Sequence, residues 1–465
     1  MKKIIISLML LSAFILSVPT FAGTPKKQNT NPDEFRRSSL TMIMMEDPRV
    51  DPTIQGLVKE GFRAAQVPDK FDSFDLGYDY KIFDPMQITI TDEARTEFAK
   101  FSGKKKSKGS KGAKGAGIAA GITGLVGSLA GFEMGPTEKK YQNPTIDTTK
   151  ADRATRAYLY LRDNRIAKKL MDQWFEADSG RLTTNVVADR AFFNATPEQK
   201  AAAMENFSER KPMDAIMSMG GMDMINNTFV TVSSFRYLTA DEMAAEILNG
   251  AAIGAAFLPR DAADLVMSTA ELSAMTATMS IGKGYCINST TYLYKLVWNE
   301  EVMEAIRNSF GSIDAYNSLD KFHLEFVGES SAYCQVAVGK RTLEEAVEYA
   351  VSRSMDKVVA KLEKENEVFR TVTPLTGVTP EITASIGTKE CLKQGDKYDV
   401  LMNMGPDEKT GLTVYKSIGS LKVDTVGNNM GADNDDKDAS SNTYSTFKGK
   451  LPKTAHPGTL IRQAN

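Results

Sequence analysis

A sharp change in composition near Lys104 constrains the fold more than any other feature of this sequence. Six lysines stand among glycines and serines from Lys104 to Lys114, and an uncharged run follows from Gly115 to Phe132. Glycine loses more conformational freedom on folding than any other residue, and lysine is rarely buried. This stretch is therefore not expected to pack as ordinary core, and the ordered structure must be built from the segments on either side of it.

The chain is accordingly predicted to divide into six parts. They are a signal peptide, a flexible tail, an N-terminal α/β segment, a Lys/Gly-rich linker with an apolar glycine-zipper-like run, a central α+β domain and a small β domain, over residues 1–22, 23–35, 36–101, 102–145, 146–372 and 379–465.

Glycines recur at intervals of four within the apolar run, at Gly117 and Gly121 and again at Gly127 and Gly131. On a helix this spacing makes flat stripes that allow another helix to approach closely. One interpretation of 104–135 is therefore a segment that pairs helices or lies on a membrane surface, with its lysines meeting anionic head groups. The other is a flexible basic linker with an apolar tail. The sequence leaves both interpretations open.

The first 22 residues have the layout of a cleavable secretory signal peptide. Two lysines follow Met1, an apolar stretch runs from Ile4 to Val18, and small residues stand at the positions that a signal peptidase reads before Gly23. The apolar stretch is short for a bilayer span, which favours cleavage over a retained anchor. We expect an exported protein of the periplasm or outer membrane, with secretion as a further destination.

Helical and strand periodicities alternate before and after the linker. Ser39 to Met45 predicts a strand, and the apolar positions from Ile54 to Ala65 have helical spacing. A helical pattern runs from Asp152 to Trp174, and Thr228 to Tyr237 reads as a strand.

The second half of the central domain has the clearest patterns. Tyr285 to Trp298 is rich in β-formers, and Phe322 to Val338 predicts two strands joined by a turn at Gly328. The Thr342-Leu-Glu-Glu345 capping box opens a long amphipathic helix. The order of these elements predicts an α+β fold, a mixed sheet with helices on one side.

After Thr379-Pro380 the pattern changes to short strands separated by glycine turns, which predicts a small all-β barrel or sandwich. The expected strands are Ile382–Ile386, Tyr398–Met402, Leu412–Ile418, Leu421–Val426, Tyr444–Phe447 and Thr459–Arg462.

No catalytic or cofactor-binding pattern emerges from the residues. The two histidines, His323 and His456, have no neighbour that nominates a nucleophile, and no phosphate-binding loop or zinc pattern is present. The acidic run from Asp433 to Asp438 lacks the glycine and glutamate of an EF-hand loop, so a solvated loop is favoured over a weak calcium site. The formal net charge of −2 gives no footprint for nucleic acid. We expect no cofactor, no resident metal and no nucleic-acid partner.

Three cysteines in an exported chain cannot all pair internally. Cys286 and Cys334 both fall on predicted strands and are the candidates for one disulfide, whereas Cys391 belongs to the C-terminal domain. Three buried thiols are the other interpretation, and the favoured one.

The chain resembles a family of exported proteins from Gram-negative anaerobes to which no activity is assigned. The resemblance rests on several stretches spread over most of the mature chain, namely Arg36-Arg-Ser-Ser-Leu40, Asn164 to Leu170 with Trp174-Phe175, Asn226 to Val230, Thr291 to Trp298, Ile382 to Gly387, Tyr415 to Gly419 and Pro457 to Arg462. It implies export and no functional residue.

These features predict a cell-envelope protein with a non-catalytic binding, scaffold or assembly role, whose partner is a protein or an envelope component. The alternative is a hydrolase of envelope or extracellular polymers, acting through carboxylates that cannot be singled out among 59 acidic residues. A cleft with converging ionisable groups would favour the hydrolase, and an exposed apolar patch would favour the binding protein.

Overall fold

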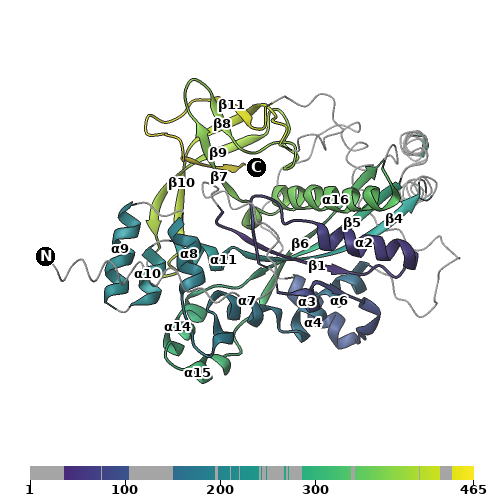
Figure 1. Ribbon diagram of the computed structural model, residues 1–465, viewed down its shortest axis with the longest axis horizontal. Helices are drawn as coiled ribbons and strands as arrows, with labels where there is room; N and C mark the ends of the chain where they lie inside the picture. Colours follow the sequence, from purple (N-terminus) through teal and green to yellow (C-terminus); the bar gives the residue numbers. More distant parts are fainter. Residues whose placement is uncertain are drawn as a thin grey trace. The chain divides into compact units, whose positions relative to one another are not determined.

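The computed structural model describes residues 36–74, 76–103, 150–193, 197–209, 211–218, 220–239, 285–336, 341–407, 409–429 and 442–464, with single positions at 242, 248, 267, 268 and 271. The predicted signal peptide, the acidic run and the glycine stripes at Gly117, Gly121, Gly127 and Gly131 lie outside these residues. The described residues form an α+β structure with a mixed sheet and a closed six-stranded barrel, which confirms the predicted fold class (Figure 1).

The mixed sheet has the strand order β2-β1-β4-β5-β6, with β3 also paired to β1. Its strands are β1 (Ser39–Met45), β2 (Asp72–Ser73), β3 (Ile82–Phe83), β4 (Thr228–Thr239), β5 (Tyr285–Leu296) and β6 (Leu324–Val336). β1 is parallel to its neighbours β2, β3 and β4, whereas β4, β5 and β6 are antiparallel.

Strand β1 carries the N-terminal segment into the interior of this sheet, between β2 and β4. All seven of its residues are buried, as expected of a parallel strand that is covered on both faces. Ser39 to Met44 pair in register with Thr228 to Ser233 of β4. The parts predicted at 36–101 and 146–372 therefore share one sheet.

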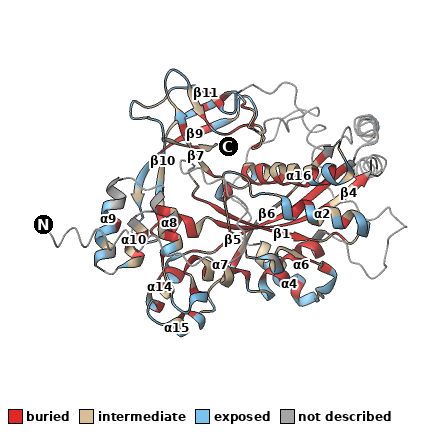
Figure 2. Ribbon diagram, viewed as in Figure 1, coloured by how far each residue is buried: buried red, intermediate tan, exposed pale blue. Residues whose placement is uncertain are grey.

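Helices cover both faces of the sheet, not one as predicted (Figures 1 and 2). Helices α2 (Pro52–Ala64) and α16 (Leu343–Glu365) pack on one face through residues such as Phe62 and Val351. The opposite face is covered by a larger set of helices. They include α4 (Asp92–Gly103), α6 (Lys150–Asp163), α7 (Ile166–Trp174), α8 (Asn185–Phe193), α9 (Pro197–Ser208), α10 (Pro212–Ser218), α11 (Gly221–Asn226), α14 (Glu300–Ser309) and α15 (Ile313–Asn317), with α3 (Tyr78–Lys81) beside β1 and β3.

Helix α16 begins with the predicted capping box. The Thr342 hydroxyl accepts from the Glu345 amide, and the Glu345 carboxylate accepts from the Thr342 amide. Where α2 crosses α16, a Cβ on Gly61 would lie 3.1 Å from the Glu348 Cα. Glycine at this position therefore lets the two helices pack closely.

The helix predicted from Asp152 to Trp174 is two helices. α6 ends at Asp163 and α7 begins at Ile166, and the backbone of Arg165 between them is left-handed, with φ 52° and ψ 42°. The apolar spacing continues across the break, which is why periodicity alone predicts a single helix.

The turn predicted at Gly328 is absent, since β6 runs without interruption through it. The pairing with β5 shifts at this point, because Leu293 pairs with Gly328 and Tyr294 pairs with Phe326. A Cβ on Gly328 would lie 2.9 Å from the Asn366 amide oxygen. The glycine thus serves a close approach of Asn366 at a bulge and not a change of chain direction.

The barrel closes in the order β10-β11-β8-β7-β12-β9. Its strands are β7 (Val372–Gly377), β8 (Ile382–Ala384), β9 (Lys397–Pro406), β10 (Thr413–Thr425), β11 (Ser445–Gly449) and β12 (Leu460–Gln463). Two predicted strands merge into β10, and β7 lies before the boundary predicted at Thr379. Leu375 of β7 is buried in the barrel core with Val400 and Ile461.

Cys286 and Cys334 form no disulfide. In the β5–β6 register, Cys286 pairs with Gln335 and Cys334 pairs with Ile287. Neighbouring residues of a strand point to opposite faces of the sheet, so the two sulfur atoms are directed away from each other. The candidate bridge is therefore wrong, and these two residues are buried thiols, as the favoured interpretation had them. Among the helices within the described ranges, none is long and apolar enough to cross a membrane.

Candidate functional site

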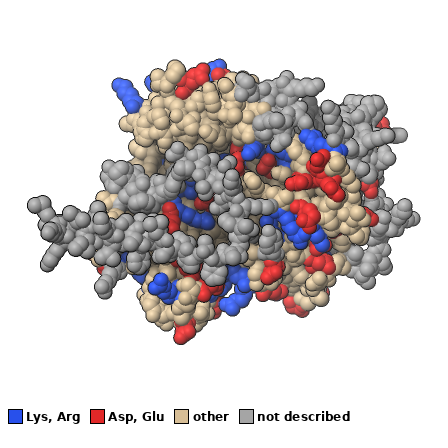
Figure 3. Space-filling view, in the orientation of Figure 1, with Lys and Arg blue, Asp and Glu red and all other residues tan. Residues whose placement is uncertain are grey.

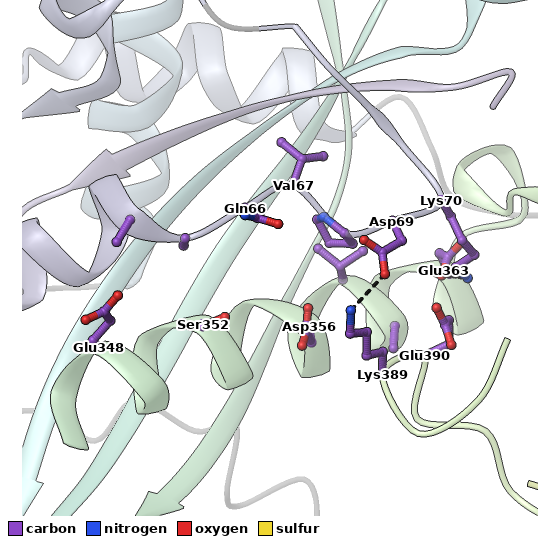
Figure 4. Close-up of a pocket in the computed structure, with 15 residues that line it drawn as sticks. Gln66, Val67, Asp69, Lys70, Glu348, Ser352, Asp356, Glu363, Lys389 and Glu390 are labelled. Atoms are coloured by element: carbon purple, nitrogen blue, oxygen red, sulfur yellow. Dashed lines mark hydrogen bonds and ion pairs between the residues drawn. The ribbon is translucent and has the colours of Figure 1, made fainter. Parts of the chain in front are cut away.

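A pocket of about 250 Å³ lies where three segments meet, and we call it the charged pocket (Figure 4). The connection between α2 and β2 supplies Asp69 and Lys70, helix α16 supplies Asp356 and Glu363, and the connection after β8 supplies Lys389 and Glu390. The site therefore combines residues that are more than three hundred positions apart in the sequence.

Helix α16 provides the floor of the charged pocket through polar residues one turn apart. Glu348, Ser352 and Asp356 follow each other at intervals of four and lie along one side of the helix in Figure 4. The adjoining side of α16 carries the buried apolar residues that pack on the sheet. The amphipathic pattern that folds the helix thus also sets this row of polar side chains.

Two lysines bridge the segments that form the charged pocket. Lys389 Nζ lies 2.8 Å from an oxygen of Asp69, and Lys70 Nζ lies 2.6 Å from an oxygen of Glu363. The Thr371 hydroxyl donates to the second oxygen of Glu363 at 2.8 Å. Burial lowers the pKa of Lys389, but the hydrogen bond and charge of Asp69, with the charges of Asp356 and Glu390, outweigh burial and leave the pKa raised. These ion pairs hold the barrel connection and the α2–β2 connection against α16.

Two carboxyl groups of the charged pocket are held in environments that favour the protonated form. Burial raises the pKa of Asp356 to about 6, against the pull of Arg353, whose Nη1 lies 2.9 Å away. Burial also raises the pKa of Glu390, although the Gly387 amide and the Asn429 side chain donate to it at 2.6 and 2.9 Å. Near neutral pH, protonation of Asp356 is therefore accessible.

This arrangement can hold the three segments together by ion pairs, or exchange protons through its buried carboxyl groups. The lining residues include no histidine and no cysteine. Within the described ranges, no group of three or more His, Cys, Asp or Glu side chains is placed to hold a metal ion. Any hydrolytic chemistry here would rest on Asp356 and Glu390.

A second feature is an exposed apolar surface on the β9–β10 hairpin, which we call the hairpin face. Met402, Met404 and Val414 are 39%, 55% and 46% exposed. Met402 and Met404 are two residues apart and share a face of β9, and Lys416 of β10 pairs with Met402. The hairpin face is thus a row of flexible apolar side chains with a lysine beside it.

The hairpin is braced from its other side. The Thr413 amide donates to Asp223 of α11 at 2.8 Å. A Cβ on Gly411, whose φ is +69°, would lie 2.8 Å from atoms of Met217 and Met222, so the turn packs tightly on α10 and α11. The hairpin face is therefore presented by a supported strand pair.

Charge is distributed unevenly over the surface seen in Figure 3. Acidic and basic side chains lie next to one another over α2 and α16, whereas the barrel shows a largely uncharged surface in this view. On α2, Lys59 forms an ion pair with Glu46, 2.7 Å apart.

The sequence predicted none of these residues as functional. His323 and His456, for which the sequence indicates no catalytic role, are exposed, and each bonds to a nearby backbone carbonyl. The polar row on α16 is visible in the sequence as polar residues at intervals of four, but its partners Asp69, Lys389 and Glu390 become neighbours only through the fold. The alternation of Met402 and Met404 was visible too, although it did not show which face of β9 would be exposed.

No protein-family model matches the chain, and no curated protein is significantly similar to it.

Proposed function

We propose that this chain is an exported protein of the cell envelope, in the periplasm or at the outer membrane, with a non-catalytic binding, scaffold or assembly role. Its partner is a protein of the envelope, bound at the hairpin face. Export rests on the signal-peptide pattern of residues 1–22.

The observation that carries the binding role is the exposure of Met402, Met404 and Val414 on a braced hairpin. Exposed apolar side chains that gather in one place are characteristic of interaction surfaces. Methionine is enriched at protein interfaces because its flexible side chain adapts to the partner. A hairpin already held on its other face loses little conformational entropy when a partner binds.

The test is a quantitative cross-linking and recovery experiment from the envelope fraction, with the mature chain expressed in its own host. The double variant Met402→Glu/Met404→Glu should lower recovery of the partner about tenfold or more, because each change would bury an unpaired charge in the interface. Met204→Glu is the matched control, since Met204 is an exposed methionine on α9, 54% exposed and outside the hairpin face.

Equal recovery with the double variant and the parent would contradict the proposal. A loss of recovery with Met204→Glu as well would show that added charge alone, and not the hairpin face, determines association.

A hydrolase acting on envelope polymers is the second candidate, and one observation favours it. Asp356 and Glu390 line one pocket, and burial raises the pKa of both, as in pairs of catalytic carboxyl groups. Against it, the pocket of about 250 Å³ is small for a polymer segment, and each carboxyl group is already bonded to protein groups. Release of soluble fragments from envelope polysaccharide, abolished by Asp356→Asn/Glu390→Gln, would establish this candidate instead.

A further inference from the structure

A second cavity, of about 350 Å³, lies between the ends of α4 and β6 and the junction of α6 with α7. We call it the aromatic cavity. Its walls are mostly apolar and aromatic, formed by Phe101, Tyr158, Leu161, Tyr294, Leu319 and Phe322. The rings of Phe101 and Tyr158 lie 4.7 Å apart. Its volume is near the lower end of the roughly 300–1,000 Å³ in which proteins bind small molecules.

Arg165, at the junction of α6 and α7, lines this cavity from an unusual backbone conformation. Its φ of 52° and ψ of 42° lie in the left-handed region, where a residue with a side chain is less stable than in the right-handed region. Glycine or asparagine would occupy this position at lower cost. Strained positions of this kind concentrate at binding and catalytic sites.

Arg165 also differs from the other cations around the aromatic cavity in its partners. Arg162 Nη1 lies 2.6 Å from Glu97, and its Nε lies 2.8 Å from Asp163. Lys168 is paired with Asp172 and stacks 4.2 Å from the centre of the Tyr316 ring. Among the described residues, no carboxylate forms an ion pair with Arg165, which is exposed at the rim. Asp320 also lines the cavity, but among the described residues no ion pair joins it to Arg165, so a positive charge is left available beside the apolar walls.

We propose that the aromatic cavity binds an apolar anion, a small molecule with an aromatic or alkyl body and one carboxylate, sulfonate or phosphate group. The body lies among Phe101, Tyr158 and Leu319, and the guanidinium of Arg165 binds the anionic group. A guanidinium presents several N–H donors in a fixed planar arrangement that suits such oxygens. Binding of this ligand in the aromatic cavity does not require a partner at the hairpin face.

The experiment titrates the full mature chain with two fluorescent probes that differ by one charge. They are 8-anilinonaphthalene-1-sulfonate and its uncharged counterpart N-phenyl-1-naphthylamine. Arg165→Asn should raise the dissociation constant of the sulfonate about tenfold and leave that of the neutral probe unchanged, because one charge-assisted interaction is lost. Arg165→Lys keeps the charge but loses the planar set of donors, so its affinity for the sulfonate should lie between those of the parent and Arg165→Asn. Arg181→Asn, an exposed arginine outside the cavity, is the matched control and should change neither constant.

Leu319→Trp fills the aromatic cavity and should weaken both probes. If both probes bind this variant like the parent, they occupy another surface and the proposal is overturned. Equal affinity of the sulfonate for Arg165→Asn and the parent would overturn the role of Arg165 and with it the preference for an anion.

Discussion

The mixed sheet and the barrel bury their apolar side chains in different ways. The sheet has a core on each face. Its strand β1, which begins at Ser39, pairs with the distant strand β4, which begins at Thr228. The barrel is built only from strands between Val372 and Gln463 and surrounds a single small core. One region therefore depends on contacts between remote segments, and the other on neighbours in sequence.

The two regions also treat polar groups differently. Within the sheet, the buried hydroxyl groups of Ser233 and Thr291 bond to each other across strands at 2.8 Å. In the barrel the paired threonine hydroxyls of Thr425 and Thr446, 2.7 Å apart, are exposed. The sheet thus contains a buried pair of hydroxyl groups whose partners must both be present, whereas the buried Ser445 hydroxyl of the barrel bonds to backbone groups of Gly427 and Ile386. We expect that removing one strand prevents the whole barrel from folding. Single substitutions should lower the free energy of unfolding most when they are made in the sheet core.

The largest effect should come from removing β7. A fragment that begins at Arg370 should fold cooperatively, whereas one that begins at Thr379 should not, because it lacks β7, which pairs with both β8 and β12 and buries Leu375. Without β7 the barrel would be open at two strand edges. The dispersion of amide signals in NMR spectra of the two fragments measures this difference. A dispersed spectrum for the shorter fragment would show that β7 is dispensable.

A substitution in the sheet core should cost less than loss of a strand but more than one in the barrel. Trp174 is fully buried, stacks on Phe74 at 4.5 Å and donates from its ring nitrogen to Thr228 at 2.9 Å. Trp174→Ala should lower the free energy of unfolding by about 3–5 kcal/mol, measured by urea denaturation followed by circular dichroism. Val400→Ala in the barrel is the comparison and should cost about 2 kcal/mol. A larger loss for Val400→Ala would reverse the ranking of these two substitutions.

The smallest effect concerns the charged pocket, where the two regions meet, and it depends on pH. Because burial raises the pKa of Asp356 to about 6 in the folded state, the folded chain binds this proton more tightly than the unfolded chain, whose aspartate has a pKa of about 4. The stability contributed by the protonated group is fully present below about pH 4 and is lost as the pH rises through about 6.

Asp356→Asn retains a neutral side chain at every pH. The variant should match the parent near pH 4 and exceed its free energy of unfolding by about 1–3 kcal/mol at pH 8. Denaturation at a series of pH values measures the difference. A variant that is less stable than the parent at pH 8 would show that the ion pair with Arg353 outweighs burial.

The sequence by itself determined the elements whose causes are local. The seven residues of β1 and the capping box at Thr342 were predicted at the positions where the structure has them, because strand composition and cap chemistry act over a few residues. The α+β class and the barrel followed from the order and spacing of such elements. Those features can be predicted without knowing which segments meet in the fold.

Only the tertiary structure decided what depends on remote partners. It placed β1 between β2 and β4, assigned Gly328 to a close approach of Asn366, and fixed the register that separates Cys286 from Cys334. The same holds for the candidate sites. Burial raises the pKa of Asp356. Arg165 lines an aromatic cavity at the break between α6 and α7, where its own backbone is left-handed although the apolar pattern continues across the break. Periodicity records which side of an element is apolar, but burial and charge at a site depend on the segments that fold against that side.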